Sequence, residues 1–211
     1  MEKTLQHDNK STADPAIQRS GRIKMLLVLG VCAAPLLFSY VTYYLIKPTG
    51  RTNYGALIDP RAHPIPANLA ATTLDGKPAS LDAWRGKWIM LQTGPAACAD
   101  ACQKQLFAAR QLRTMQGKER ERIERVWLIT DREPLDTLIL REYDDVHMLR
   151  VSPQALKAWL PLDPGAAGDS ADGHFFLIDP LGNLMMRFPN NPEPSRVKKD
   201  MTRLLTASAI G

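Results

Sequence analysis

Residues 88–106 read WIMLQTGPAACADACQKQL, and this stretch decides the fold. The apolar run from Trp88 to Thr93 has the length and composition of a buried strand, and Gly94-Pro95 ends it. Cys98 and Cys102 follow, just before a helical pattern begins. The sequence therefore predicts a strand that leads into a helix, with two thiols at the junction.

Two thiols at the start of a helix have a defined chemistry. A helix N-terminus stabilises thiolates and lowers the thiol pKa, which suits disulfide exchange or the binding of a soft metal ion. The four-residue offset puts both sulfurs on one face, so both reach a single Cu(I) ion, for which a third ligand from a distant loop completes a trigonal site. The same sulfurs form a disulfide if the Cα atoms lie roughly 4.4 to 6.8 Å apart. A structural disulfide, or two buried thiols without chemistry, is the alternative to either function.

Residues 25–46, MLLVLGVCAAPLLFSYVTYYLI, are 22 positions without a charge. As a helix they span about 33 Å, which is enough to cross the hydrocarbon core of a bilayer. Three basic residues lie just before the span, within 19–24, and two lie after it, within 47–51, which favours an N-terminus inside the cell. A cleaved signal peptide is the alternative, but the run exceeds a usual signal core and no small-x-small cleavage site follows Ile46.

The chain accordingly divides into four segments: a disordered cytoplasmic tail (1–24), a transmembrane helix (25–46), a tether containing Pro and Gly (47–66) and one domain (67–211). In a bacterium this domain would face the periplasm, an oxidising compartment. The net charge of the chain is +5, but residues 51–211 carry 21 Lys and Arg against 19 Asp and Glu, a net of +2. This small positive charge argues against nucleic-acid binding.

Helical and strand patterns alternate along the rest of the chain. Apolar residues at three- and four-residue spacing from Leu106 to Ile123 predict one amphipathic helix that frays near Gly117. Pro134 is placed to open a helix through Tyr143, and Ser152-Pro153 to begin another. The order predicts an α/β fold, a thioredoxin-like mixed sheet with helices on both faces, preceded by one transmembrane helix. The other predicted elements are an Asp75-Gly76 turn, strands 126–129 and 146–151, a loop 161–173, a hairpin of 175–178 with 184–188 at the edge of the sheet, and a helix from Ser195.

Three segments resemble the Sco family of cytochrome oxidase assembly proteins, also called SenC-like copper chaperones. The run Cys98-Ala-Asp-Ala-Cys-Gln103 is similar to the copper-site motif C-P-D-V-C-P, with Asp100 retained and both prolines replaced. Residues 130–137, TDREPLDT, are similar to V-D-P-E-R-D-T, and residues 177–182, LIDPLG, are similar to L-I-x-P-x-G. The N-terminal anchor agrees as well, and the resemblance covers about residues 67–208.

One position departs from the family pattern. The family supplies a third copper ligand, a histidine nine residues before the hairpin proline, and that count from Pro180 falls on Ala171. His174, three residues later, is the nearest candidate, but an odd shift turns a strand residue to the opposite face. An ordinary histidine at the start of a strand is the alternative. Related exchange domains carry a cis-proline opposite their cysteines, where this chain has Gly173 or His174.

The resemblance implies a membrane-anchored protein of respiratory cytochrome c oxidase assembly that handles copper or the thiols of the copper site. Its expected partners are the bacterial inner membrane and an oxidase subunit or another assembly factor, with Cu(I) as the expected cofactor and no small-molecule substrate. Cys98 and Cys102 form the expected catalytic pair, with Cys98 as the more exposed, attacking thiol and Cys102 resolving. With His174 they form the expected metal-ligand set. A periplasmic thiol-disulfide oxidoreductase and a non-catalytic assembly scaffold are the two alternatives.

Overall fold

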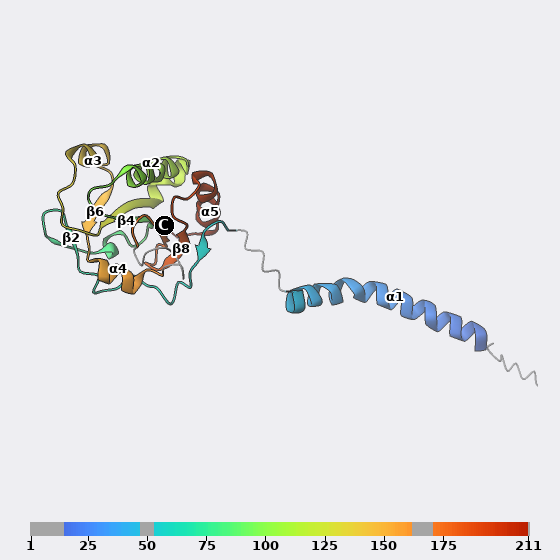
Figure 1. The fold of residues 1–211 in the computed structure, drawn as a ribbon. Helices are drawn as coiled ribbons and strands as arrows, with labels where there is room; N and C mark the ends of the chain where they lie inside the picture. Colours follow the sequence, from blue (N-terminus) through green and yellow to red (C-terminus); the bar gives the residue numbers. More distant parts are fainter. Residues whose placement is uncertain (1–14, 47–52, 162–170, 211) are drawn as a thin grey trace, which may run out of the picture. The chain divides into compact units, whose positions relative to one another are not determined.

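The computed structural model describes residues 15–46, 53–161 and 171–210. The chain divides into two compact units, Met1–Arg51 and Thr52–Gly211. Helix α1 (Pro15–Val41) forms the first unit together with a short π-helical stretch, η1 (Thr42–Ile46) (Figure 1).

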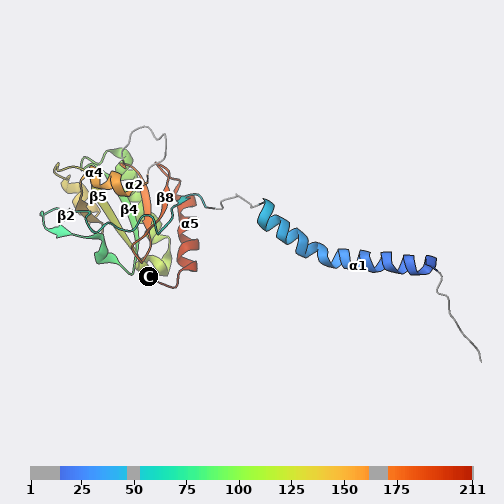
Figure 2. The ribbon, with the colours of Figure 1, turned by 90° about the horizontal axis from the view of Figure 1, so that it is seen from below.

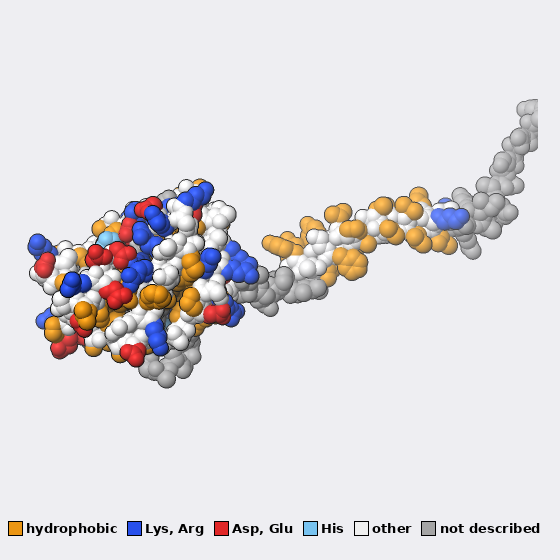
Figure 3. Space-filling view, turned by 90° about the horizontal axis from the view of Figure 1, so that it is seen from above, with side chains coloured by type: hydrophobic (Ala, Val, Ile, Leu, Met, Phe, Trp, Pro, Cys, Tyr) orange, Lys and Arg blue, Asp and Glu red, His pale blue; other side chains and the backbone are white. Residues whose placement is uncertain are grey.

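The N-terminal helix confirms the predicted candidate for a membrane span. Its segment Gly21–Tyr44 is long and apolar enough to cross a membrane, by length and composition. Hydrophobic side chains cover much of it, whereas charges of both signs are interspersed on the domain face in Figure 3. The helix begins at Pro15 rather than Met25, so residues 15–24 of the predicted tail are helical. Residues 1–14 of that tail and 47–52 of the predicted tether lie outside the described residues.

The second unit is built on one eight-stranded mixed sheet with the strand order β1-β8-β7-β4-β5-β6-β2-β3. Strand β4 is buried along its whole length because it lies between parallel β5 and antiparallel β7. The strands are β1 (Ala56–Leu57), β2 (Ala71–Thr73), β3 (Pro78–Ala79), β4 (Trp88–Gly94), β5 (Ile123–Ile129), β6 (His147–Arg150), β7 (Phe175–Ile178) and β8 (Leu184–Phe188). The helices are α2 (Asp100–Thr114), α3 (Thr137–Glu142), α4 (Pro153–Trp159) and α5 (Pro194–Ala207), with 3-10 turns η2 (Leu81–Trp84) and η3 (Gly117–Arg122).

Helices cover both faces of the sheet, as predicted, which makes the fold a thioredoxin-like α/β layout. Alternate strand residues form two separate cores: Met90 packs with α2 and α5, whereas Leu91 packs with α4. A third cluster lies between α2, α3 and the end of β5, and it includes Trp127 and Cys98. Figure 1 shows α2 and α5 on one side of the sheet and α4 on the other, and Figure 2 shows α5 beside β8. The predicted hairpin of β7 and β8 forms, but it is not the edge, because β1 pairs with β8.

In the domain, two helices differ from the sequence prediction by more than two residues. Helix α2 ends at Thr114, and Ile123 starts β5 instead of continuing the helix, because Gly117 adopts a left-handed φ of 60° and the chain turns. Helix α3 begins at Thr137, where the carboxylate of Asp136 caps it, and not at Pro134. Residues 162–170 of the predicted loop lie outside the described residues.

The segment 53–66, predicted as tether, lies against the domain. Its strand β1 pairs with β8, the backbone of Pro64 bridges Asn183, and the side chain of Ile65 is buried. Asp200 on α5 fixes the start of this segment: its Oδ2 accepts hydrogen bonds from the backbone N–H groups of Tyr54 at 2.7 Å and Gly55 at 2.9 Å. The described part of the tether therefore belongs to the folded unit.

Glu124 on β5 lies between Lys87 and His147. Its Oε1 accepts a hydrogen bond from Lys87 Nζ at 2.5 Å, and its Oε2 is 3.1 Å from His147 Nε2. Partial burial opposes the charged form, but the bonds with Lys87 and His147 outweigh it, so the pKa of Glu124 lies below its ordinary value.

This environment gives a pH-dependent contribution to stability. Because the folded-state pKa of Glu124 is lowered, its contribution is present above the unfolded value of about 4.3 and is lost as the pH falls through the folded pKa. We expect Glu124→Gln to be less stable than the wild type at neutral pH and nearly equal to it in acid. Urea unfolding of both proteins across this pH range measures the difference, and parallel stability curves would contradict the assignment.

Candidate functional site: the Cys98–Cys102 pair

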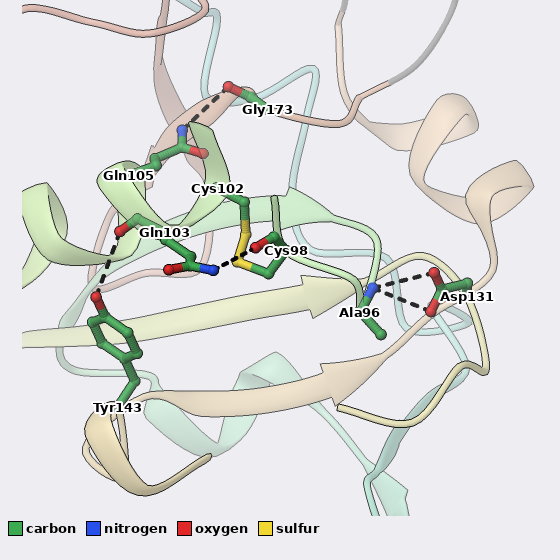
Figure 4. The surroundings of a disulfide bond; sticks show 8 residues. All are labelled: Ala96, Cys98, Cys102, Gln103, Gln105, Asp131, Tyr143 and Gly173. Atoms are coloured by element: carbon green, nitrogen blue, oxygen red, sulfur yellow. Dashed lines mark hydrogen bonds between the residues drawn. A yellow bond between two sulfur atoms is a disulfide. The ribbon is translucent and has the colours of Figure 1, made fainter. Parts of the chain in front are cut away.

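The two cysteines form a disulfide between the end of β4 and the start of α2 (Figure 4). Their Cα atoms are 5.0 Å apart, within the range of roughly 4.4 to 6.8 Å that a disulfide requires. Cys98 has a φ of 34°, in the left-handed region that residues with a Cβ rarely adopt, and its N–H donates to the carbonyl of Pro95 at 3.2 Å. This tight turn directs the chain into α2 and brings the two sulfurs together.

The two cysteines differ in exposure, and Cys98 is not the more exposed one that the sequence predicts. Cys98 is 0 % exposed and belongs to the cluster with Trp127 and Leu106, whereas Cys102, on the first turn of α2, is partly exposed. The sequence places Cys98 in a loop, which suggests exposure. The left-handed turn instead folds that loop under the helix, so Cys102 is the more accessible sulfur.

Hydrogen bonds hold the loop that carries Cys98. Both carboxylate oxygens of Asp131 accept from the N–H of Ala96, at 3.2 and 3.1 Å, and Gln103 Nε2 donates to the carbonyl of Cys98 at 3.1 Å (Figure 4). Arg150 Nη1 in turn donates to the carbonyl of Asp131 at 2.7 Å. Sequence reasoning did not assign this role to Asp131, although the motif TDREPLDT that contains it was the available signal. Asp100 is the first residue of α2, consistent with a helix-start role.

Gly173 lies on the other side of the site, at the position that corresponds to the cis-proline of related exchange domains. Its N–H donates to the carbonyl of Thr93 at 2.9 Å, and its carbonyl accepts from Gln105 Nε2 at 3.2 Å. Its φ of 77° suits glycine, and an added Cβ would lie 3.1 Å from Asn190 Oδ1. This backbone position connects the end of β4, the first turns of α2 and the start of β7.

His174 does not join the two cysteines. Its ring centroid is 6.0 Å from that of Phe176, which packs on the α4 face, whereas Phe175 packs beneath α2. By the alternation of strand side chains, His174 is directed to the face opposite the cysteines. Among residues 15–46, 53–161 and 171–210, no three His, Cys, Asp or Glu side chains gather as a metal site would require. The predicted set of Cys98, Cys102 and His174 is therefore not brought together, and the cysteines alone would offer two sulfur donors after reduction.

A cleft of about 600 Å³ lies beside the disulfide, between α2, the Gly173 backbone and the segment Asn190–Pro194. Cys102 lines this cleft and Cys98 does not. The lining also includes Phe107, which is 52 % exposed, and Lys104. The volume lies within the range of roughly 300 to 1,000 Å³ that is typical of binding pockets.

Arg125 on β5 is a buried cation. Arg125 pairs with Asp145, and its side chain is almost fully buried. Burial lowers the pKa of Arg125, and the contact with Asp145 opposes that effect. Arg110 on α2 stacks over the ring of Tyr143 at 4.7 Å and pairs with Glu142. The contacts of Arg110 fasten α2, the helix that carries Cys102, to α3, whereas the Arg125–Asp145 pair joins β5 to the turn after α3.

Comparison with known proteins agrees with this fold. A family model described as transmembrane-like, thioredoxin-like, C-terminal domain matches residues 88–208. No curated protein sequence matches the chain. Among solved structures, apo Sco1 from Thermus thermophilus is similar over 74 % of this chain and 99 % of its own, with 21 % identity and a TM-score of 0.54.

Two further structures are similar at comparable levels. A SCO1/SenC family lipoprotein from Bacillus anthracis has 19 % identity and a TM-score of 0.50, covering 71 % of this chain and 99 % of its own. Arabidopsis thaliana ScoI, solved with copper bound, has 16 % identity and a TM-score of 0.50, covering 74 % and 99 %. The likeness to Sco structures predicted from the motifs is thus confirmed, and at these identities it establishes the fold.

Proposed function

The chain belongs to the family described as transmembrane-like, thioredoxin-like, C-terminal domain, and from this premise we propose that it is a membrane-anchored thiol-disulfide exchange protein of respiratory oxidase assembly. One observation carries the proposal: Cys98 and Cys102 are bridged at the start of α2, and Cys102 lines an apolar cleft. A disulfide with one accessible sulfur is ready to accept electrons from a client dithiol. We place the domain in the periplasm of a bacterium, with α1 in the inner membrane.

The proposed client is a protein whose copper-binding cysteines must be brought to the right redox state, such as an oxidase subunit or another assembly factor. Support comes from the Sco-like motifs around Cys98, Asp131 and Pro180. Asp131 gives one of these motifs a structural role, because it holds the backbone of Ala96 in the cysteine loop.

The test uses the full chain in detergent micelles, oxidised and mixed with a reduced synthetic peptide that carries two cysteines. We expect two protein thiols to appear as two peptide thiols disappear, measured by alkylation and mass spectrometry. Cys98→Ala with Cys102→Ala should abolish the exchange, and Cys32→Ala should not change it. In the native organism, the double replacement should lower the amount of assembled cytochrome c oxidase. Absence of exchange by the wild type would refute the proposal and leave copper handling and the non-catalytic scaffold as the alternatives.

Copper handling is the second candidate, because reduction would leave two sulfur donors four residues apart on one helix start. Since His174 is directed to the opposite face, we propose that any Cu(I) taken up is held by the two thiolates. We expect competition with a colorimetric chelator to show Cu(I) binding that Cys98→Ala and Cys102→Ala remove and His174→Ala leaves unchanged. A loss of about tenfold or more in affinity on His174→Ala would contradict the two-donor assignment.

A further inference from the structure

We infer that client proteins join the chain at Cys102, through the cleft along α2, and that Cys98 is the buried partner that leaves and later resolves. The inference rests on the proposed function and deepens it, since it names the attacked sulfur and the class of client segment. The order is the reverse of the one expected from the sequence, in which the first cysteine attacks.

Exposure decides which sulfur is attacked. Thiol-disulfide exchange requires the incoming sulfur to approach one sulfur of the bridge along the bond, from the side opposite the other sulfur. Cys98 is 0 % exposed within the cluster of Trp127 and Leu106, so an incoming group cannot reach it without opening the core. Cys102 is partly exposed and lines the cleft. The reachable end of the bridge is therefore Cys102.

The N-terminus of α2 suits Cys98 as the leaving group. It directly precedes Ala99, the N-cap of α2, where the first-turn N–H groups of the helix favour an anion. Burial opposes the thiolate, so the leaving sulfur takes up a proton once it is released. Gln103 and Asp131 hold the loop in place through its backbone, which keeps Cys98 close enough to resolve the intermediate.

Exchange with a client dithiol proceeds in two steps. A client thiolate forms a bond to the sulfur of Cys102, the Cys98–Cys102 bond breaks, and Cys98 leaves with the electron pair and is protonated. The second thiolate of the client then attacks its own sulfur in the mixed disulfide, which releases Cys102 as a thiolate. Two electrons pass from the client dithiol to the protein. In the reverse direction, Cys102 attacks a client disulfide and Cys98 resolves.

The cleft indicates what kind of segment carries the client cysteine. Its walls near Cys102 include apolar side chains from α2, among them Phe107 and Ala108, and prolines at 192 and 194, with Lys104 as a cation. An extended polypeptide whose cysteine is followed by apolar side chains matches this lining, because those side chains would leave water on binding. The occupant we assign is thus an extended, apolar, cysteine-bearing segment of the client.

The first experiment tests the order of attack in the full chain in micelles, with Cys32→Ala in every variant. Cys98→Ser leaves only Cys102, and Cys102→Ser leaves only Cys98. We expect the Cys102 thiol to form a mixed disulfide with an aromatic disulfide reagent at least about tenfold faster than the Cys98 thiol. In denaturant the two rates should converge, since the difference belongs to the fold. Equal rates in the folded state, or a faster Cys98, would overturn the inference even if the wild type exchanges with dithiol peptides.

The second experiment tests the cleft with two reduced dithiol peptides, one with apolar residues after its cysteines and one with serines. Phe107→Ser should slow exchange with the apolar peptide by several-fold and leave the serine peptide unaffected. Leu181→Ser is the matched control, because Leu181 is 59 % exposed and lies in the hairpin turn outside the cleft lining. Equal effects of Phe107→Ser on both peptides, or none on either, would overturn the cleft assignment. Failure of the wild type with both peptides would instead refute the proposed function.

Discussion

Trp127→Ala is expected to lower the free energy of unfolding by about 3–5 kcal/mol, because it deletes a fully buried ring and leaves a cavity. Trp127 lies on β5 in the cluster that also contains Cys98, Leu106 and Ile139. The rigid sheet limits how far these neighbours collapse into the space. The loss is measured by urea unfolding of the full chain in micelles, followed by circular dichroism.

The same substitution should change the chemistry of the site. With the ring removed, Cys98 loses part of the packing that excludes solvent, so the reduced thiol should be alkylated faster than in the wild type. Trp84→Ala is the control, since Trp84 is only partly buried and packs against the α4-face core, with its ring tilted against that of His147 and the ring centroids 4.4 Å apart. Equal destabilisation by both replacements, or an unchanged alkylation rate of Cys98, would contradict the role of Trp127 beneath the disulfide.

Local patterns were enough to predict the elements around the site. The apolar run and the Gly94-Pro95 break located the end of β4. Ser152-Pro153 located the start of α4, where the Ser152 hydroxyl accepts from the N–H of Ala155 at 3.2 Å. These features depend on residues within one or two turns of each other, so they can be read from a short window of sequence.

Features set by distant contacts could not be predicted in this way. Cys98 is buried because of its positive φ and because residues from α2, β5 and α3 form a cluster around it. No local sequence pattern encodes either feature. The helical spacing that continued to Ile123 was misleading, because pairing with Trp88 on β4 places Ile123 in a strand. Apolar residues at the end of a helix and the start of a buried strand look alike in a short window.

The segment 53–66 is the clearest example: its proline and glycine content is typical of a tether, but Asp200, far along the chain, fixes its start. The carboxylate of Asp200, whose side chain is 2 % exposed, accepts from the N–H groups of Tyr54 and Gly55. An added Cβ on Gly55 would lie 2.6 Å from side-chain atoms of Met186, so the backbone runs directly over β8. This close approach lets the segment pack as part of the fold.

Asp200→Ala should therefore cost about 2–4 kcal/mol of unfolding free energy, because two backbone N–H groups lose a charged acceptor in a buried place. Amide hydrogen exchange at Tyr54 and Gly55 should accelerate more than exchange in β4. Arg203→Ala is the matched control: Arg203 Nη1 is 4.0 Å from Asp200 Oδ1 and its side chain is 45 % exposed, so removing it should cost less than about 1 kcal/mol. If the two replacements have equal effects, the ion pair rather than the backbone hydrogen bonds holds the segment. If neither has an effect, the segment is a tether after all, and the folded domain begins beyond it.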